Sequence, residues 1–124
     1  MEEVIVVSLR KGAPPIPKGY VPVRIDRKSP LLGNPFFLDD KNDRAGRDRV
    51  IDNFRDYLRG EMREKSPVWQ EVIKLADRVQ RGEKLALQCW CSPKPCHGDI
   101  IKKAIYGILR KRGYVFEGQQ SLSL

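Results

Sequence analysis

The chain has 124 residues, of which 40% are apolar and 32% charged, so it holds one domain and excludes a two-domain enzyme. Its apolar runs are too short to cross a membrane, and Met1-Glu2-Glu3 lacks the pattern of a signal peptide. All three cysteines fall between positions 89 and 96, so we expect a reducing, cytoplasmic setting without a disulfide framework. The net charge of +8 favours an anionic partner such as a nucleic acid, a nucleotide or an acidic protein.

Apolar periodicity predicts that strands and helices alternate along the chain. A β-branched run at 4–7 predicts a strand buried on both faces. Alternation over 21–25 predicts a second strand, in which Pro22 requires either an edge position or the start of the strand. Proline and Gly-Asn turns exclude helix from 27–37. A 3.6-residue period predicts helices at about 48–58, ended by Gly60, and from Pro67 to Gly82.

The second half of the chain continues this alternation. We expect a buried strand at 84–90, a loop at 91–95, a helix that begins near Cys96 and ends at Gly113, and a short strand at 114–116. The order predicts a small single-domain α/β fold, a three-layer Rossmann-like sheet with flanking helices, over residues 1–118. Residues 119–124 are expected to form a loose tail. Ligands of α/β domains bind where strands end and helices begin, which places the site after the 84–90 strand.

The segment 89–99 contains every cysteine and the only histidine of the chain, and it has three interpretations. Cys96, His97 and Asp99 are candidate catalytic residues, because a helix N-terminus and nearby cations lower the pKa of a thiol. Alternatively, Cys89, Cys91, Cys96 and His97 could bind zinc, although their spacing is unfavourable, so we expect no metal or cofactor. In the third interpretation the cysteines are small buried side chains, His97 caps the helix and Asp99 favours its dipole.

Basic residues follow the predicted strands and could hold a phosphate beside this segment. Arg10 and Lys11 leave the first strand, and Arg27 precedes turns whose dihedral angles are fixed. Trp90 is expected to lie in the core or in a pocket wall rather than to serve as a platform on which bases stack. Arginines at 44–63 alternate with acidic residues and are typical of a solvated face. The candidate ligand-binding residues are Arg10, Lys11, Arg27, Asn34 and Ser92.

Four segments, 6–12, 25–27, 30–36 and 89–99, resemble an uncharacterised family, the domain of unknown function 4326, and the resemblance spans about Val4 to Ile108. The Cys-Trp-Cys and Pro-Cys-His-Gly-Asp segment is the specific part, and Gly-Asn-Pro-Phe supports it. The chain departs from the family pattern at Ser8 and Asp26, where the family has Asn and Gly. The resemblance implies a Rossmann-like, nucleotide-handling fold by analogy and carries no established activity.

Together these features predict a domain that binds the phosphate of a nucleotide or nucleic acid and that could be a hydrolase or transferase acting on a nucleotide. Whether it is an enzyme stays open from the sequence. The alternative is a non-catalytic, zinc-stabilised module that binds nucleic acid or a protein of the nucleic-acid machinery.

Overall fold

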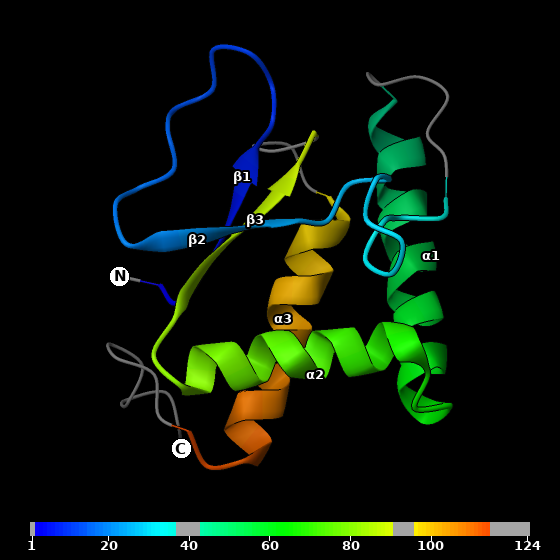
Figure 1. Ribbon diagram of the computed structural model, residues 1–124. Coiled ribbons are helices and arrows are strands. Elements are labelled where there is room, and N and C mark those ends of the chain that lie inside the picture. Colours follow the sequence, from blue (N-terminus) through cyan, green and yellow to red (C-terminus); the bar gives the residue numbers. More distant parts are fainter. Residues whose placement is uncertain (1, 37–42, 91–95, 115–124) are drawn as a thin grey trace.

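The computed structural model describes residues 2–36, 43–90 and 96–114 of the chain. Its elements are β1 (Val4–Ser8), β2 (Tyr20–Arg24), α1 (Arg44–Arg63), α2 (Pro67–Gln80), β3 (Lys84–Cys89) and α3 (His97–Lys111), shown in Figure 1. The strand order is β1-β3-β2, and β3 pairs in parallel with both neighbours. The α/β class and the parallel pairing are therefore confirmed. No helix in the described part of the chain is long and apolar enough to span a membrane.

The central strand of the sheet is β3, because its apolar residues are buried on both of its faces. Leu85, Ala86 and Leu87 are fully buried. β1 is an edge strand in which only Val4 is buried, so the prediction that both faces of this strand are covered is wrong. β2 lies at the other edge, which is one of the two positions that Pro22 allows, and Pro22 is exposed there, where a missing N–H costs no sheet hydrogen bond.

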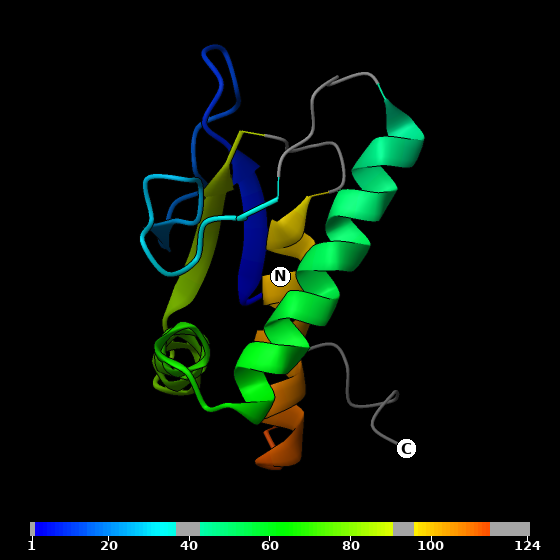
Figure 2. The ribbon, with the colours of Figure 1, turned by 90° about the vertical axis from the view of Figure 1, so that its right-hand side faces the viewer.

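The hydrophobic core lies against one face of the sheet. Val4, Leu85, Leu87 and Cys89 occupy alternate positions on that face, and they share one buried cluster with residues of all three helices. Figure 2 shows α1 and α3 together on the same side of the strands. The three-layer arrangement expected from the sequence stays a prediction. The connection from β1 to β2 contains no helix, unlike that of a doubly wound fold.

Capping residues determine where the helices begin. α1 begins at Arg44 because the Asp43 carboxylate accepts from Gly46 N at 2.9 Å, and it continues past Gly60, so the shorter helix expected at 48–58 is corrected. Ser66 caps α2 and α3 begins after Cys96, both as predicted. Tyr114 lies outside any strand. Residues 115–116 of the expected strand, the 91–95 loop and the 119–124 tail lie outside the described residues.

Candidate functional site

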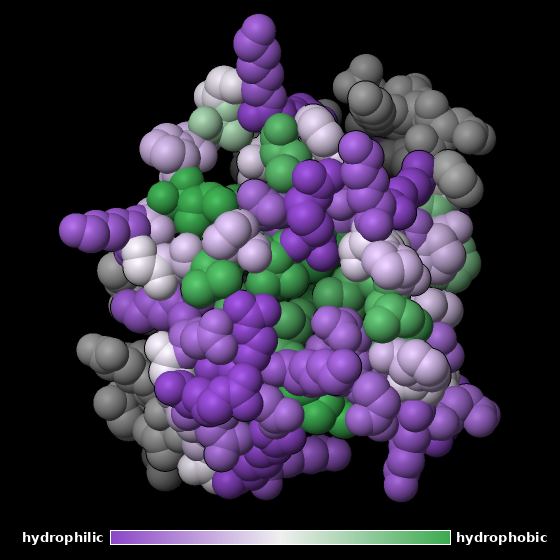
Figure 3. Space-filling view, viewed as in Figure 1, coloured by the Kyte–Doolittle hydropathy of each residue, from purple (hydrophilic) through white to green (hydrophobic). Residues whose placement is uncertain are grey.

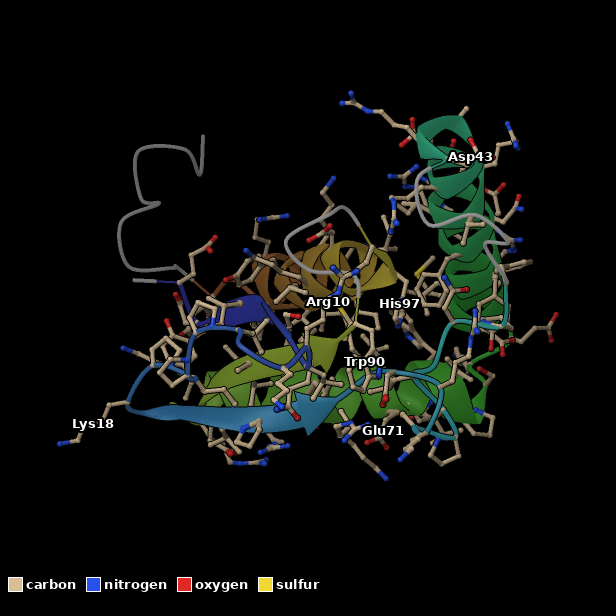
Figure 4. All side chains as sticks on the ribbon, turned by 90° about the horizontal axis from the view of Figure 1, so that it is seen from above. Arg10, Lys18, Asp43, Glu71, Trp90 and His97 are labelled. Atoms are coloured by element: carbon tan, nitrogen blue, oxygen red, sulfur yellow. The ribbon has the colours of Figure 1, made fainter. Side chains whose placement is uncertain are left out.

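A cavity of about 700 Å³ opens at the carboxyl ends of the strands, between the loops that follow them, α1 and the start of α3. This is the end of the sheet at which the sequence places the site. Figure 4, which looks down from above, shows Arg10, Trp90 and His97 close to one another there. Of the candidate residues, Arg10, Arg27, Asn34, Cys96 and His97 line this cavity.

Two basic residues that were not expected from the sequence, Lys28 and Arg47, also line the cavity. Lys28 follows Arg27, and Arg47 comes from α1, where it is only 8% exposed. The arginines of α1 were expected to form a solvated face, but Arg47 belongs to the inner stripe of the helix. The sequence signal for this inward position is the spacing of Arg47, three residues from Val50 and four from Ile51, which also line the cavity.

Hydrogen bonds tie the three loops of this rim together through Trp90. Arg10 Nε donates to the Trp90 carbonyl at 2.8 Å, and Trp90 Nε1 donates to Asp26 Oδ2 at 3.0 Å. Both carboxylate oxygens of the buried Asp26 also accept from the Arg24 guanidinium. These bonds, the one from Arg24 foremost, hold the pKa of Asp26 below its usual range although burial opposes them. Asp26 is therefore an ionised anchor in the pocket wall.

Cys89 and Cys96 form a buried pair in the same wall, with their sulfur atoms 3.1 Å apart. The hydrogen bond with Cys89 and burial raise the pKa of Cys96 above its ordinary value, and the Gly98 N–H, which donates to its sulfur, lowers it by less. The structure contradicts the lowered pKa that the helix N-terminus led us to expect. A catalytic role for Cys96 stays a prediction.

This pair makes a prediction about thiol reactivity. In native protein at pH 7.5, Cys89 and Cys96 should react with iodoacetamide at least about tenfold more slowly than in urea, because both are buried and the thiol of Cys96 stays protonated. Peptide mapping by mass spectrometry after timed quenching measures each site. Labelling of Cys96 at the rate of an exposed thiol in the folded chain would contradict the buried pair.

His97 is fixed by its surroundings and is less available for proton transfer than the sequence suggested. Its Nε2–H donates to the Ile25 carbonyl at 2.6 Å. Its ring packs edge-on against the Phe54 ring, with the two ring centroids 5.1 Å apart. Burial lowers the pKa of His97, although the carbonyl groups of Ile25 and Leu32 oppose this effect. The imidazole is therefore neutral at pH 7 and fastens the start of α3 to the loop after β2.

The amides of Gly98 and Asp99 in the first turn of α3 are bonded to the N-cap residue Cys96. Asp99 Oδ2 accepts from Cys96 N at 3.1 Å, while Cys96 accepts from Gly98 N and Asp99 N. This is a capping box with cysteine as the N-cap. The amides of Gly98 and Asp99 are therefore already used within the helix start. Asp99 caps the helix and is not among the described residues that line the cavity.

The described residues do not form the zinc site that the sequence offers as an alternative. Cys89 and Cys96 are together, but His97 Nε2 is bonded to a backbone carbonyl. Within the described ranges no three metal-ligand side chains gather. Cys91 and Ser92 lie outside these ranges, so their contribution stays a prediction.

Lys11 is exposed and does not line the cavity, whereas Asn34 lines it and accepts from Phe36 N at 2.9 Å.

Fold and site define a small parallel α/β domain with a basic pocket at the carboxyl ends of its strands. The chain belongs to the family described as domain of unknown function DUF4326, whose model matches residues 10–107. No curated protein and no solved structure matches the chain.

Proposed function

We propose that the pocket binds the phosphate group of a nucleotide or of a nucleic acid. The observation that carries this proposal is the charge of its wall. Arg10, Arg27, Lys28 and Arg47 line the cavity, and the single carboxylate of its described lining, Asp26, is paired with Arg24. Positive charge therefore exceeds negative charge inside a concave site, where partial exclusion of water strengthens attraction to an anion.

The side chains of this wall suit phosphate better than a monovalent anion. Guanidinium groups donate paired hydrogen bonds that match phosphate oxygens. Two of the guanidinium groups are already oriented, since Arg27 Nη2 donates to the Phe36 carbonyl at 3.1 Å and Arg10 Nε to that of Trp90. Oriented donors lose less conformational freedom when a ligand binds.

Binding is supported more strongly than catalysis. Cys96 and His97 both line the cavity, but the former has a raised and the latter a lowered pKa, so both are neutral at pH 7. A neutral thiol and an imidazole bonded to a carbonyl are poor starting points for nucleophilic attack. We therefore propose binding as the function, and hydrolysis or transfer at a nucleotide as a further possibility for these two residues.

Replacing Arg27 by alanine should weaken nucleotide binding about tenfold or more. Each charge-assisted hydrogen bond contributes about 1.5–3 kcal/mol, and ~1.4 kcal/mol is tenfold in affinity. The measurement is calorimetric titration of nucleoside mono- and triphosphates and a short oligonucleotide at two salt concentrations. Arg59→Ala is the matched control, because it removes the same charge from an exposed position of α1.

Two results would overturn the proposal. One is that no phosphate compound binds the wild-type chain. The other is that Arg27→Ala and Arg59→Ala weaken binding equally, since diffuse attraction to the net positive charge treats both positions alike.

A further inference from the structure

Trp90 is more exposed than any other large apolar side chain in the described part of the chain. It is 51% exposed, and it lines the basic pocket. An indole left half in water at a pocket mouth retains apolar area that a ligand can cover. Isolated exposed apolar residues are common, so exposure alone does not mark a binding surface.

What distinguishes Trp90 is that its position is fixed from two sides. Its indole N–H donates to Asp26 and its carbonyl accepts from Arg10, which follow two different strands. Asp26 is itself only 6% exposed and accepts from two nitrogens of Arg24, Nε and Nη2. Burying a carboxylate is costly unless its bonds are made, and here one of those bonds orients an exposed ring. The N–H at the edge of the indole is thus bonded to Asp26, while about half of the side chain remains exposed to water.

The surface of the molecule is largely polar on the side that the space-filling view shows. Figure 3 shows hydrophilic side chains over much of the molecule and apolar groups between them. In the lining itself, Phe36 and Trp90 supply aromatic surface, while Arg27, Lys28 and Arg47 supply positive charge. A ligand that satisfies both parts has a flat π-system joined to a phosphate. A cavity of about 700 Å³ falls in the size range of small-molecule sites.

We propose that Trp90 is the stacking platform for the base of a nucleoside phosphate, and that Asp26 is the positioning residue that holds its ring. This inference rests on the proposed phosphate-binding function and adds the base to it. Stacking on an aromatic face tolerates different bases because each base has a π-face, so the platform selects nucleotides over other phosphates. Selection among the bases does not follow from it.

The test compares nucleotides with phosphates that lack a base. In a Trp69→Phe background, where Trp90 is the remaining tryptophan, the four ribonucleoside monophosphates should quench its fluorescence. They should bind about tenfold or more tightly than ribose 5-phosphate in calorimetric titration, since one stacked base is worth about that factor. Trp90→Ala should abolish this preference, so that nucleotides and ribose 5-phosphate bind this variant with about equal affinity. Trp90→Phe keeps an aromatic ring but lacks the N–H that bonds to Asp26, so it should retain only part of the preference.

The positioning role of Asp26 needs its own pair of variants. Asp26→Asn keeps an oxygen that accepts from the indole N–H and should retain the base preference. Asp26→Val removes the acceptor, so the preference should fall and the anisotropy of Trp90 fluorescence should drop as the ring gains freedom. Circular dichroism checks that each variant is folded. If Asp26→Val does not fold, the Trp90 variants still test whether the ring stacks on the base.

The outcomes separate the two proposals. If ribose 5-phosphate and the nucleotides bind equally, and Arg27→Ala weakens both, phosphate binding stands and the stacking platform is overturned. If the nucleotide preference survives Trp90→Ala, the platform is again overturned. If no phosphate compound binds at all, both proposals fall.

Discussion

Replacing Phe54 by alanine is expected to lower the free energy of unfolding by about 3–5 kcal/mol. Phe54 is 1% exposed and lies in α1, with its ring centroid 5.7 Å from that of Tyr57 and 5.1 Å from that of His97. Removing the ring leaves a cavity between α1 and the start of α3. A typical domain has about 5–15 kcal/mol of stability, so this one change removes a large share of it.

Urea unfolding at pH 7.5, followed by circular dichroism, measures this effect. Phe54→Leu keeps most of the apolar volume and should cost less than about 1.5 kcal/mol. Met62→Ala lies on the same helix at 40% exposure and should change stability by less than about 0.5 kcal/mol. Equal effects of Phe54→Ala and Met62→Ala would show that α1 does not pack through this ring.

The junction from β3 to α3 could be predicted because its signals are local. Apolar residues at 84–90, two prolines and a 3.6-residue period after Cys96 define a strand, a loop and a helix without knowledge of the rest of the fold. The strand order could not be predicted, since the apolar run of β1 reads like a central strand. Only pairing shows that β3 takes the middle and leaves β1 at an edge.

The start of α1 illustrates a different difficulty. The sequence from Arg44 to Arg47 contains no apolar side chain apart from Ala45, so periodicity placed the beginning of this helix four residues too late. Asp43, a favoured N-cap residue, is the sequence signal that marks the observed start of this helix. Both Arg47 and Lys28 were missed as pocket residues because a charged side chain on a helix or turn is usually solvated.

The hydrogen bonds of the site were hardest to foresee from sequence. Cys96 to Asp99 has the spacing of a capping box, but cysteine is not a usual N-cap, so the sequence alone does not indicate that Asp99 bonds to the Cys96 amide. The bond between Asp26 and Trp90 joins residues 64 positions apart, and no sequence period predicts it. Arg10 and Arg27 were placed at the pocket because they follow strands whose carboxyl ends meet at one edge.

The stability of the protein is expected to fall as the pH drops below about 6.5, the ordinary pKa of histidine in an unfolded chain. His97 is the only histidine, and burial holds its folded pKa below that value. Between the two pKa values the unfolded chain binds more protons, so the free energy of unfolding rises with pH. The stabilisation is fully present above the unfolded pKa and is lost as the pH falls through the folded pKa.

Other charged groups act on the same ring without changing this sign. Arg27 lowers the pKa of His97, and Asp99 raises it, both by less than burial. Asp26 titrates in a separate window, because its folded pKa lies below the ordinary carboxyl value and its contribution is lost only in stronger acid. Loss of stability between pH 6.5 and about 5 is therefore assigned to His97.

His97→Gln separates titration from packing. The amide of glutamine can donate to the Ile25 carbonyl as the imidazole does, but it binds no proton in this range. Urea midpoints should therefore be the same at pH 5.5 and 7.5 in this variant and differ in the wild type. His97→Ala should cost about 1–3 kcal/mol at pH 7.5, because it leaves the buried Ile25 carbonyl without this donor. If the urea midpoint of the wild type is the same at both pH values, the folded pKa of His97 is not depressed. The ring is then not held neutral by burial.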